Sequence, residues 1–171
     1  ISGHAERYAL DLTGTQIGHV PTTTGNLEYS LPFGVTAWLN PSFSGLQGIC
    51  GNRFGSTGFQ LRLNGTDLQI VNYSASLSSE TFSGSQVAAG WHPVAMSVTA
   101  SEVKVYWDAT EVLDASTHLI TPASGATSAM GLYVLEVGSG NQSFFGQFAD
   151  YGADLIFWDK ALSQDELDWL G

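Results

Sequence analysis

The chain has 171 residues and a formal net charge of −11, with 16 acidic side chains against five Lys and Arg. This negative field repels phosphate backbones and anionic lipid surfaces, so we do not expect nucleic acid as a partner. No stretch of the sequence approaches the ~18 consecutive apolar residues of a membrane-spanning helix, so no span is predicted. The length suits a single domain over residues 1–171, with a polar lead-in at 1–7.

The surface is expected to be neutral and polar. Charged residues make up 12% of the chain, against about 25% in typical proteins, and Ser, Thr and Gly are abundant. Such a composition is common in extracellular and virion proteins. The only cysteine, Cys50, follows Ile49 and is expected to be a buried thiol. The chain begins at Ile1, which fits a processed form or a piece of a larger polypeptide.

The first half of the chain contains two clear strand signals. In residues 33–39 the apolar side chains alternate and share one face, with Trp38 on the other face. Residues 58–63 and 67–71 are two alternating runs joined across Asn64-Gly65, the strongest short-range signal for a β-hairpin. The Ser-rich connection that follows, 72–86, has room for one more strand.

The centre of the chain, residues 90–113, indicates an antiparallel meander. Val94, Met96 and Val98 alternate with small polar residues, and the same pattern continues at Val103, Val105 and Trp107. Short polar breaks at 100–101 and 108–110 have the length of turns between antiparallel neighbours.

The end of the chain predicts a loop over 113–126, a strand over 130–137, a last strand from Asp154 and a short helix. Ser163 followed by Glu166 is a capping box, which marks the start of a helix. Leu167 and Leu170 would then pack that helix against the sheet.

Four motifs resemble the laminin-G-like jelly rolls of the concanavalin A-like superfamily. The motifs are the runs Trp-His-Pro-Val-Ala at 91–95, Val-Lys-Val-Tyr-Trp-Asp at 103–108, Pro-Phe-Gly-Val-Thr-Ala-Trp at 32–38 and Phe-Phe-Gly-Gln-Phe-Ala-Asp at 144–150. The resemblance implies an all-β, antiparallel jelly-roll β-sandwich of about a dozen strands with one short C-terminal helix.

The resemblance also implies details of individual positions. Residues 8–21 resemble the first hairpin of the family, and Trp38, Trp91 and Trp158 match core positions. Ala109 occupies a place where the family usually has Gly, and because Ala tolerates positive φ poorly, we expect a changed turn type.

Many members of the family hold one Ca²⁺ between the first Asp-Gly turn and an Asp near the last strand, through oxygen ligands. Asp150 and Asp154 are the candidates for the second Asp, and backbone oxygens near Gly14 are the candidates from the first turn. Thr13 replaces the usual first carboxylate, which should weaken the site. The alternative is that Asp150 only caps a turn.

Glycan recognition in this fold uses an aromatic ring that stacks on a sugar, surrounded by polar groups. The aromatic residues that the resemblance does not assign to the core supply the candidate ligand-binding residues, Tyr73, Tyr106, Trp107 and Tyr151.

Catalysis is not expected. The Glu-x-Asp-x-x-Glu strand of the glucanases of this fold is absent, as is a Gly-x-Ser-x-Gly nucleophile elbow. The four His residues show no metal-ligand spacing. The clustered carboxylates at 165–168 suit a solvated helix face.

The function predicted from the sequence is therefore a non-catalytic module for glycan binding or adhesion on an extracellular or virion surface, with a glycan or another protein surface as partner. The alternative is a structural virion protein, such as a capsid decoration or tail-fibre domain. A glycoside hydrolase or polysaccharide lyase ranks third.

Overall fold

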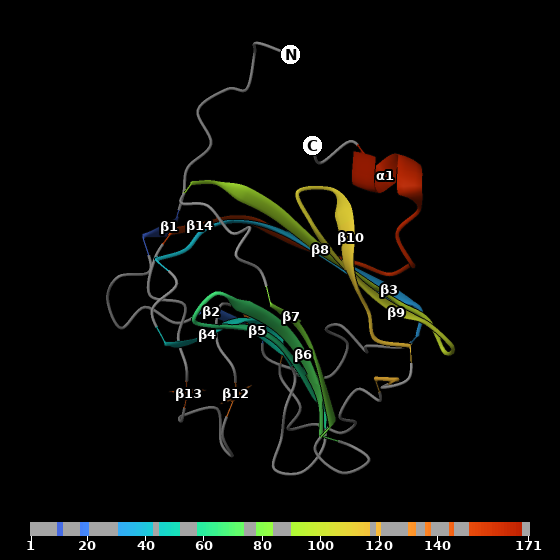
Figure 1. Cartoon of the computed structure of the whole chain (residues 1–171), viewed down its shortest axis with the longest axis horizontal. Helices are drawn as coiled ribbons and strands as arrows, with labels where there is room; N and C mark the ends of the chain where they lie inside the picture. Colours follow the sequence, from blue (N-terminus) through green and yellow to red (C-terminus); the bar gives the residue numbers. More distant parts are fainter. Residues whose placement is uncertain are drawn as a thin grey trace.

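Two six-stranded antiparallel sheets pack face to face, and a short helix lies on the outside of one of them (Figure 1). The structure is a computed structural model. It describes residues 10–11, 18–20, 31–42, 45–51, 58–73, 78–83, 90–116, 119–120, 130–132, 136–137, 144–145 and 151–168. Within these ranges there are fourteen strands and one helix. The predicted all-β jelly-roll sandwich is confirmed.

Sheet A has the strand order β1-β14-β3-β8-β9-β10. The bounds of its strands are β1 Leu10–Asp11, β3 Phe33–Asn40, β8 His92–Val98, β9 Val103–Trp107, β10 Thr110–Asp114 and β14 Tyr151–Trp158.

Sheet B has the order β2-β11-β4-β5-β6-β7. Its strands are β2 Gly18–Val20, β4 Leu46–Gly51, β5 Phe59–Asn64, β6 Asp67–Asn72, β7 Ser78–Ser83 and β11 Met130–Leu132. A separate two-stranded ribbon pairs β12, Glu136–Val137, with β13, Phe144–Phe145.

The core between the sheets follows directly from the alternation of apolar residues. In β3, Phe33, Val35, Ala37 and Leu39 all point inward, as predicted, and each is at most 3% exposed. Phe33 of sheet A meets Phe59 of sheet B with ring centroids 5.6 Å apart. Cys50 is fully buried in the same core, and this burial raises the pKa of its thiol to about 12.

The β5–β6 hairpin forms where Asn64-Gly65 predicts it. Asn64 pairs with Asp67, so Gly65 and Thr66 are the two turn residues. Gly65 has a φ of +60°, which fits a turn that requires Gly at its first central position. The connection after β6 also contains the additional strand, β7.

The turn between β9 and β10 differs from the expectation. Trp107 pairs with Thr110, so Asp108 and Ala109 form a two-residue turn. Both residues have positive φ, 50° and 59°, which is the backbone of the tight hairpin turn that normally uses Gly. The replacement of Gly by Ala has therefore kept the turn type, and the strand pairing on both sides holds Ala109 in a conformation it disfavours.

Three strand predictions are corrected by the sheet topology. The segments of the predicted first hairpin do not pair with each other, because β1 joins β14 in sheet A and β2 joins β11 in sheet B. The predicted strand 130–137 is two strands, β11 and β12, in different sheets. The last strand begins at Tyr151, not Asp154, and has an irregular register between Ala153 and Ile156.

Helix α1, Gln164–Asp168, packs on the outer face of sheet A (Figure 1). Leu167 is 1% exposed and clusters with Ala95, Tyr106 and Leu162. The segment before the helix crosses the sheet so closely that a Cβ on Gly34 would lie 2.7 Å from Leu162 Cγ. Nowhere in the described ranges is a helix long and apolar enough to cross a membrane.

Half of the predicted capping box is present at the start of α1, because the Glu166 side chain accepts from Ser163 while the Ser163 hydroxyl donates to Glu166 Oε2 at 3.0 Å and does not accept from the Glu166 N–H. The backbone N–H of Ser163 donates to Glu166 Oε2 at 2.9 Å, and the Glu166 N–H donates to the Ser163 carbonyl at 3.1 Å. Lys160 also pairs with Glu166. These bonds, led by the one from Lys160, lower the pKa of Glu166 from 4.5 to about 2.

The strained turn predicts that Ala109→Gly stabilises the protein. Gly adopts positive φ without the penalty that Ala pays, so we expect a gain of about 1 kcal/mol in the free energy of unfolding. For a chain of this length that corresponds to a rise of roughly 2–4 °C in Tm. Ala100→Gly, in a turn where Ala has an ordinary φ, is the matched control and should not stabilise. Equal or lower stability of Ala109→Gly would contradict the strain.

The lowered pKa of Glu166 predicts a loss of stability in acid. A carboxyl whose folded pKa is depressed contributes stability above its unfolded pKa, and that contribution is lost as the carboxyl is protonated. The loss should fall between pH 4.5 and about 2 and be modest, because the pair with Lys160 is solvent accessible. Urea unfolding at several pH values should show a shallower loss for Glu166→Gln, whereas Asp165→Asn should keep the wild-type dependence.

Candidate functional site

A network of polar side chains covers part of the outer face of sheet B. Phe59, Leu61 and Leu63 of β5 point into the core, so Gln60 and Arg62 between them point outward. The β5–β6 register places Gln69 directly opposite Arg62, and the β6–β7 register places Thr81 opposite Gln69. Figure 1 shows that these strands bend with their concave side away from sheet A, so the network lies on the concave face.

Arg62 is the centre of this network. Its Nε donates to Gln69 Oε1 at 2.9 Å, and its Nη1 donates to Gln60 Oε1 at 3.2 Å and to the Tyr73 hydroxyl at 3.5 Å. Tyr73 Oη in turn donates to Gln60 Oε1 at 2.9 Å, and Gln69 Nε2 reaches Thr81 Oγ1 at 3.4 Å. We call these five residues, Gln60, Arg62, Gln69, Tyr73 and Thr81, the sheet B network.

The side chains of the sheet B network range from fully buried to exposed. Gln60 is only 1% exposed, Arg62, Gln69 and Tyr73 are half-buried, and Thr81 is exposed. Just after β6, Tyr73 is fixed by its backbone N–H, which donates to the Gly58 carbonyl at 2.8 Å. The network therefore offers a rigid set of donors, acceptors and one aromatic ring at the border of the open surface.

Two of the aromatic residues predicted to bind a ligand are buried. Tyr106 is on the outer face of sheet A, as its position in the alternation implies, but α1 covers it and leaves it 6% exposed. Burial raises the pKa of its hydroxyl. Trp107 points into the core and is 4% exposed. Neither ring has a surface on which a sugar could stack, so we correct both assignments.

Trp107 takes part instead in a structural cluster with His92 and Asp108. The rings of His92 and Trp107 lie 5.0 Å apart at a tilt of 31°. His92 Nδ1 is 3.0 Å from both carboxylate oxygens of Asp108, and because a carboxylate only accepts, Nδ1 carries a proton. The cluster fastens the start of β8 to the β9–β10 turn.

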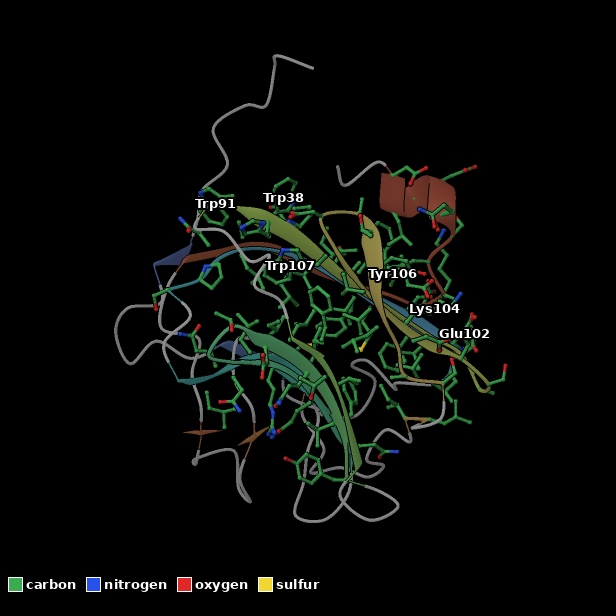
Figure 2. All side chains as sticks on the ribbon, in the orientation of Figure 1. Trp38, Trp91, Glu102, Lys104, Tyr106 and Trp107 are labelled. Carbon is green, nitrogen blue, oxygen red and sulfur yellow. The ribbon has the colours of Figure 1, made fainter. Side chains whose placement is uncertain are left out.

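The other end of the outer face of sheet A exposes aromatic surface. Trp91 is 42% exposed and Trp38 is half-buried, so Trp91 is not the core residue that the sequence predicted. The β3–β8 register pairs Trp38 with Pro93, two residues after Trp91, and Figure 2 shows both Trp side chains at the same end of the sheet. Trp158 is also half-buried, and its Nε1 donates to Thr36 Oγ1 at 3.1 Å.

The residues predicted to bind calcium are described only in part. Gly14, Asp150 and the side chain of Tyr151 lie outside the described residues. Asp154 is an exposed residue of β14 with a φ of 49°, at the irregular register. Asp11 pairs with Tyr151, so the chain leaves β1 beside the point where it enters β14. Among the described side chains, no group of three or more His, Cys, Asp or Glu could hold a metal ion.

The sequence prediction missed most of the sheet B network, although the signal was present. The Asn64-Gly65 hairpin fixes which residues of its two strands face each other, and a two-residue turn pairs Arg62 with Gln69. Tyr73 was predicted as a ligand-binding residue, but its contacts with Gln60 and Arg62 depend on the position of the chain after β6. Nothing in the pattern gives that position.

The family of the chain follows from a match over residues 14–168 to the family model described as the concanavalin A-like lectin/glucanases superfamily. The chain belongs to this superfamily. The match spans both sheets and α1, and it confirms the resemblance that the sequence motifs carry. No curated protein matches the sequence.

Solved structures with the superfamily's sandwich architecture show the same fold at low sequence identity. The CBM40 domain of the Ruminococcus gnavus IT-sialidase matches with a TM-score of 0.62 and 13% identity, over 82% of each chain. The receptor-binding domain of botulinum neurotoxin D matches with a TM-score of 0.59 and 13% identity, over 86% of this chain. That match covers 39% of the toxin domain, so this chain corresponds to less than half of it.

Proposed function

We propose that the chain is a non-catalytic carbohydrate-binding module of an extracellular or virion surface, and that its glycan binds to the sheet B network. The observation that carries the proposal is the set of hydrogen bonds that joins Arg62 to Gln60, Gln69 and Tyr73. Support from the comparisons is at the level of fold, since a CBM40 domain and toxin receptor-binding domains have the same architecture.

The chemistry of the sheet B network suits a sugar. A sugar ring presents hydroxyls that both donate and accept, and planar amide and guanidinium groups can meet two neighbouring hydroxyls at once. Tyr73 adds an aromatic ring beside these groups. Because the side chains already hold one another in place, less conformational entropy is lost when a ligand binds.

A glycan array followed by calorimetric titration tests this function. Tyr73→Ala and Gln69→Ala should weaken the affinity for the best glycan about tenfold or more, since each removes an oriented hydrogen bond that the ligand or Arg62 depends on. Trp91→Ala, on the other sheet and exposed, is the control and should leave the affinity unchanged. The site assignment is wrong if Trp91→Ala abolishes binding while Tyr73→Ala does not.

The second candidate function, a structural protein of a virion without glycan affinity, is favoured by a different observation. Trp91 is 42% exposed at the same end of sheet A as half-buried Trp38, and aromatic residues are enriched in contacts between proteins. A chain that binds no glycan and self-associates, with the association lost in Trp91→Ala, would support this candidate in place of the first.

We also propose a calcium site of the superfamily type where β1 and β14 adjoin, with Asp150 as its carboxylate and backbone oxygens near Gly14. The pairing of Asp11 with Tyr151 supports this arrangement, because the residue before Tyr151 is Asp150. Asp154 lies further along β14, beyond Tyr151 and Gly152, the two residues that pair with β1. It is therefore the weaker of the two candidate ligands.

Thermal unfolding with excess EDTA and then with millimolar Ca²⁺ tests the calcium site. An ion that binds only the folded chain raises its apparent stability, so Tm should rise with Ca²⁺ in the wild type and in Asp154→Ala, but not in Asp150→Ala. An unchanged Tm in the wild type would remove calcium from the account.

A further inference from the structure

The charge environment of Arg62 differs from that of the other described basic residues. Lys104 Nζ lies 3.0 Å from Glu102 and 3.3 Å from Glu111 (Figure 2), and these carboxylates raise the pKa of Lys104. Lys160 pairs with Glu166. Arg62 differs from Lys104 and Lys160, the other described basic residues, because its hydrogen bonds go to neutral groups, those of Gln60, Gln69 and Tyr73.

This arrangement is unexpected for a protein with 16 acidic residues and five basic ones. A half-buried guanidinium has lost part of its hydration, and neutral acceptors replace only part of the lost energy. A carboxylate is the usual partner for such a group, because its two oxygens match the guanidinium fork. Among the described residues, the hydrogen-bond partners of Arg62 are two amides and a phenol.

The neutral partners also fix the direction in which Arg62 can accept a ligand. Nε and Nη1 are held by Gln69, Gln60 and Tyr73. Nη2 makes none of these bonds, so the half-buried guanidinium still has N–H groups that a ligand could accept from. Gln60 is 1% exposed, and its Oε1 accepts from both Arg62 and Tyr73, which holds these two side chains in place.

We propose that Arg62 binds the carboxylate of an acidic sugar, so that the ligand of this module contains a uronic acid or another sugar with one carboxylate. This inference rests on the proposed function and names its ligand class. The carboxylate can accept a charge-assisted hydrogen bond from Nη2, the nitrogen that makes none of the bonds to Gln60, Gln69 and Tyr73. The −11 net charge of the chain disfavours a polyanion, so the ligand carries few charges.

Titration with matched pairs of sugars tests the inference. The probes are the methyl glycosides of glucuronic acid, galacturonic acid and N-acetylneuraminic acid, each compared with its own methyl ester, which keeps the sugar and removes the charge. At least one free acid should bind about tenfold or more tightly than its ester. Arg62→Gln should reduce that ratio to about one; because the ratio compares the two probes on the same variant, a general weakening of the site lowers both affinities and leaves the ratio interpretable.

Lys104→Gln is the matched control, because it also removes one positive charge but acts on sheet A. It should keep the wild-type ratio of acid to ester affinity, which separates a local contact from a change in net charge. Arg62→Lys keeps the charge without the fork and should give an intermediate ratio. It also serves as the second variant if Arg62→Gln does not give the cooperative thermal transition of the wild type.

Equal binding of acid and ester by the wild type would overturn the inference and leave the glycan-binding function in place. Equal or tighter binding of galactose 6-sulfate would overturn the carboxylate assignment and indicate a general anion site. If neither acidic nor neutral saccharides bind, the proposed function fails and the inference fails with it.

Discussion

The register of the β5–β6 hairpin decides which side chains of these strands face the core and which face the concave surface of sheet B. Gly65 allows the tight turn, and the turn pairs Leu61 with Ile70 and Arg62 with Gln69. Because side chains alternate between the two faces of a strand, a slip by one residue would bury Arg62 and expose the leucines. The burial of Leu61 and Leu63 therefore places Arg62 on the concave face. The same register that forms the core thus positions the sheet B network.

Sheet A is used differently, because both of its faces take part in packing. Its inner face forms the core with sheet B, and α1 covers part of its outer face through Leu167, Ala95 and Tyr106. What stays open on that face is the end with Trp91 and Trp38. The described residues thus present two surfaces of different character, a polar one around Arg62 on sheet B and an aromatic one on sheet A.

The sequence predicted the sandwich, the inward face of β3, the β5–β6 hairpin and the start of α1 after Ser163, because each depends on local alternation or on a local turn or cap. It did not predict that β1 and β2 lie in different sheets, since that choice is made by long-range pairing. It also did not predict that Trp91 is exposed and Tyr106 is buried. Both outcomes depend on which part of sheet A is covered by a segment distant in sequence, such as α1. Alternation tells which face a residue occupies, but not whether that face is covered.

The most direct test of the central claim is an NMR titration that observes the Arg Nε–H and Trp Nε1–H signals while methyl glucuronoside, or the tightest-binding acidic sugar, is added. Arg62 can be assigned by loss of its signal in Arg62→Lys. The account predicts that the Arg62 Nε–H shifts on binding and that the Trp91 indole does not. A shift of the Trp91 indole with an unchanged Arg62 signal would place the ligand on sheet A and contradict the account.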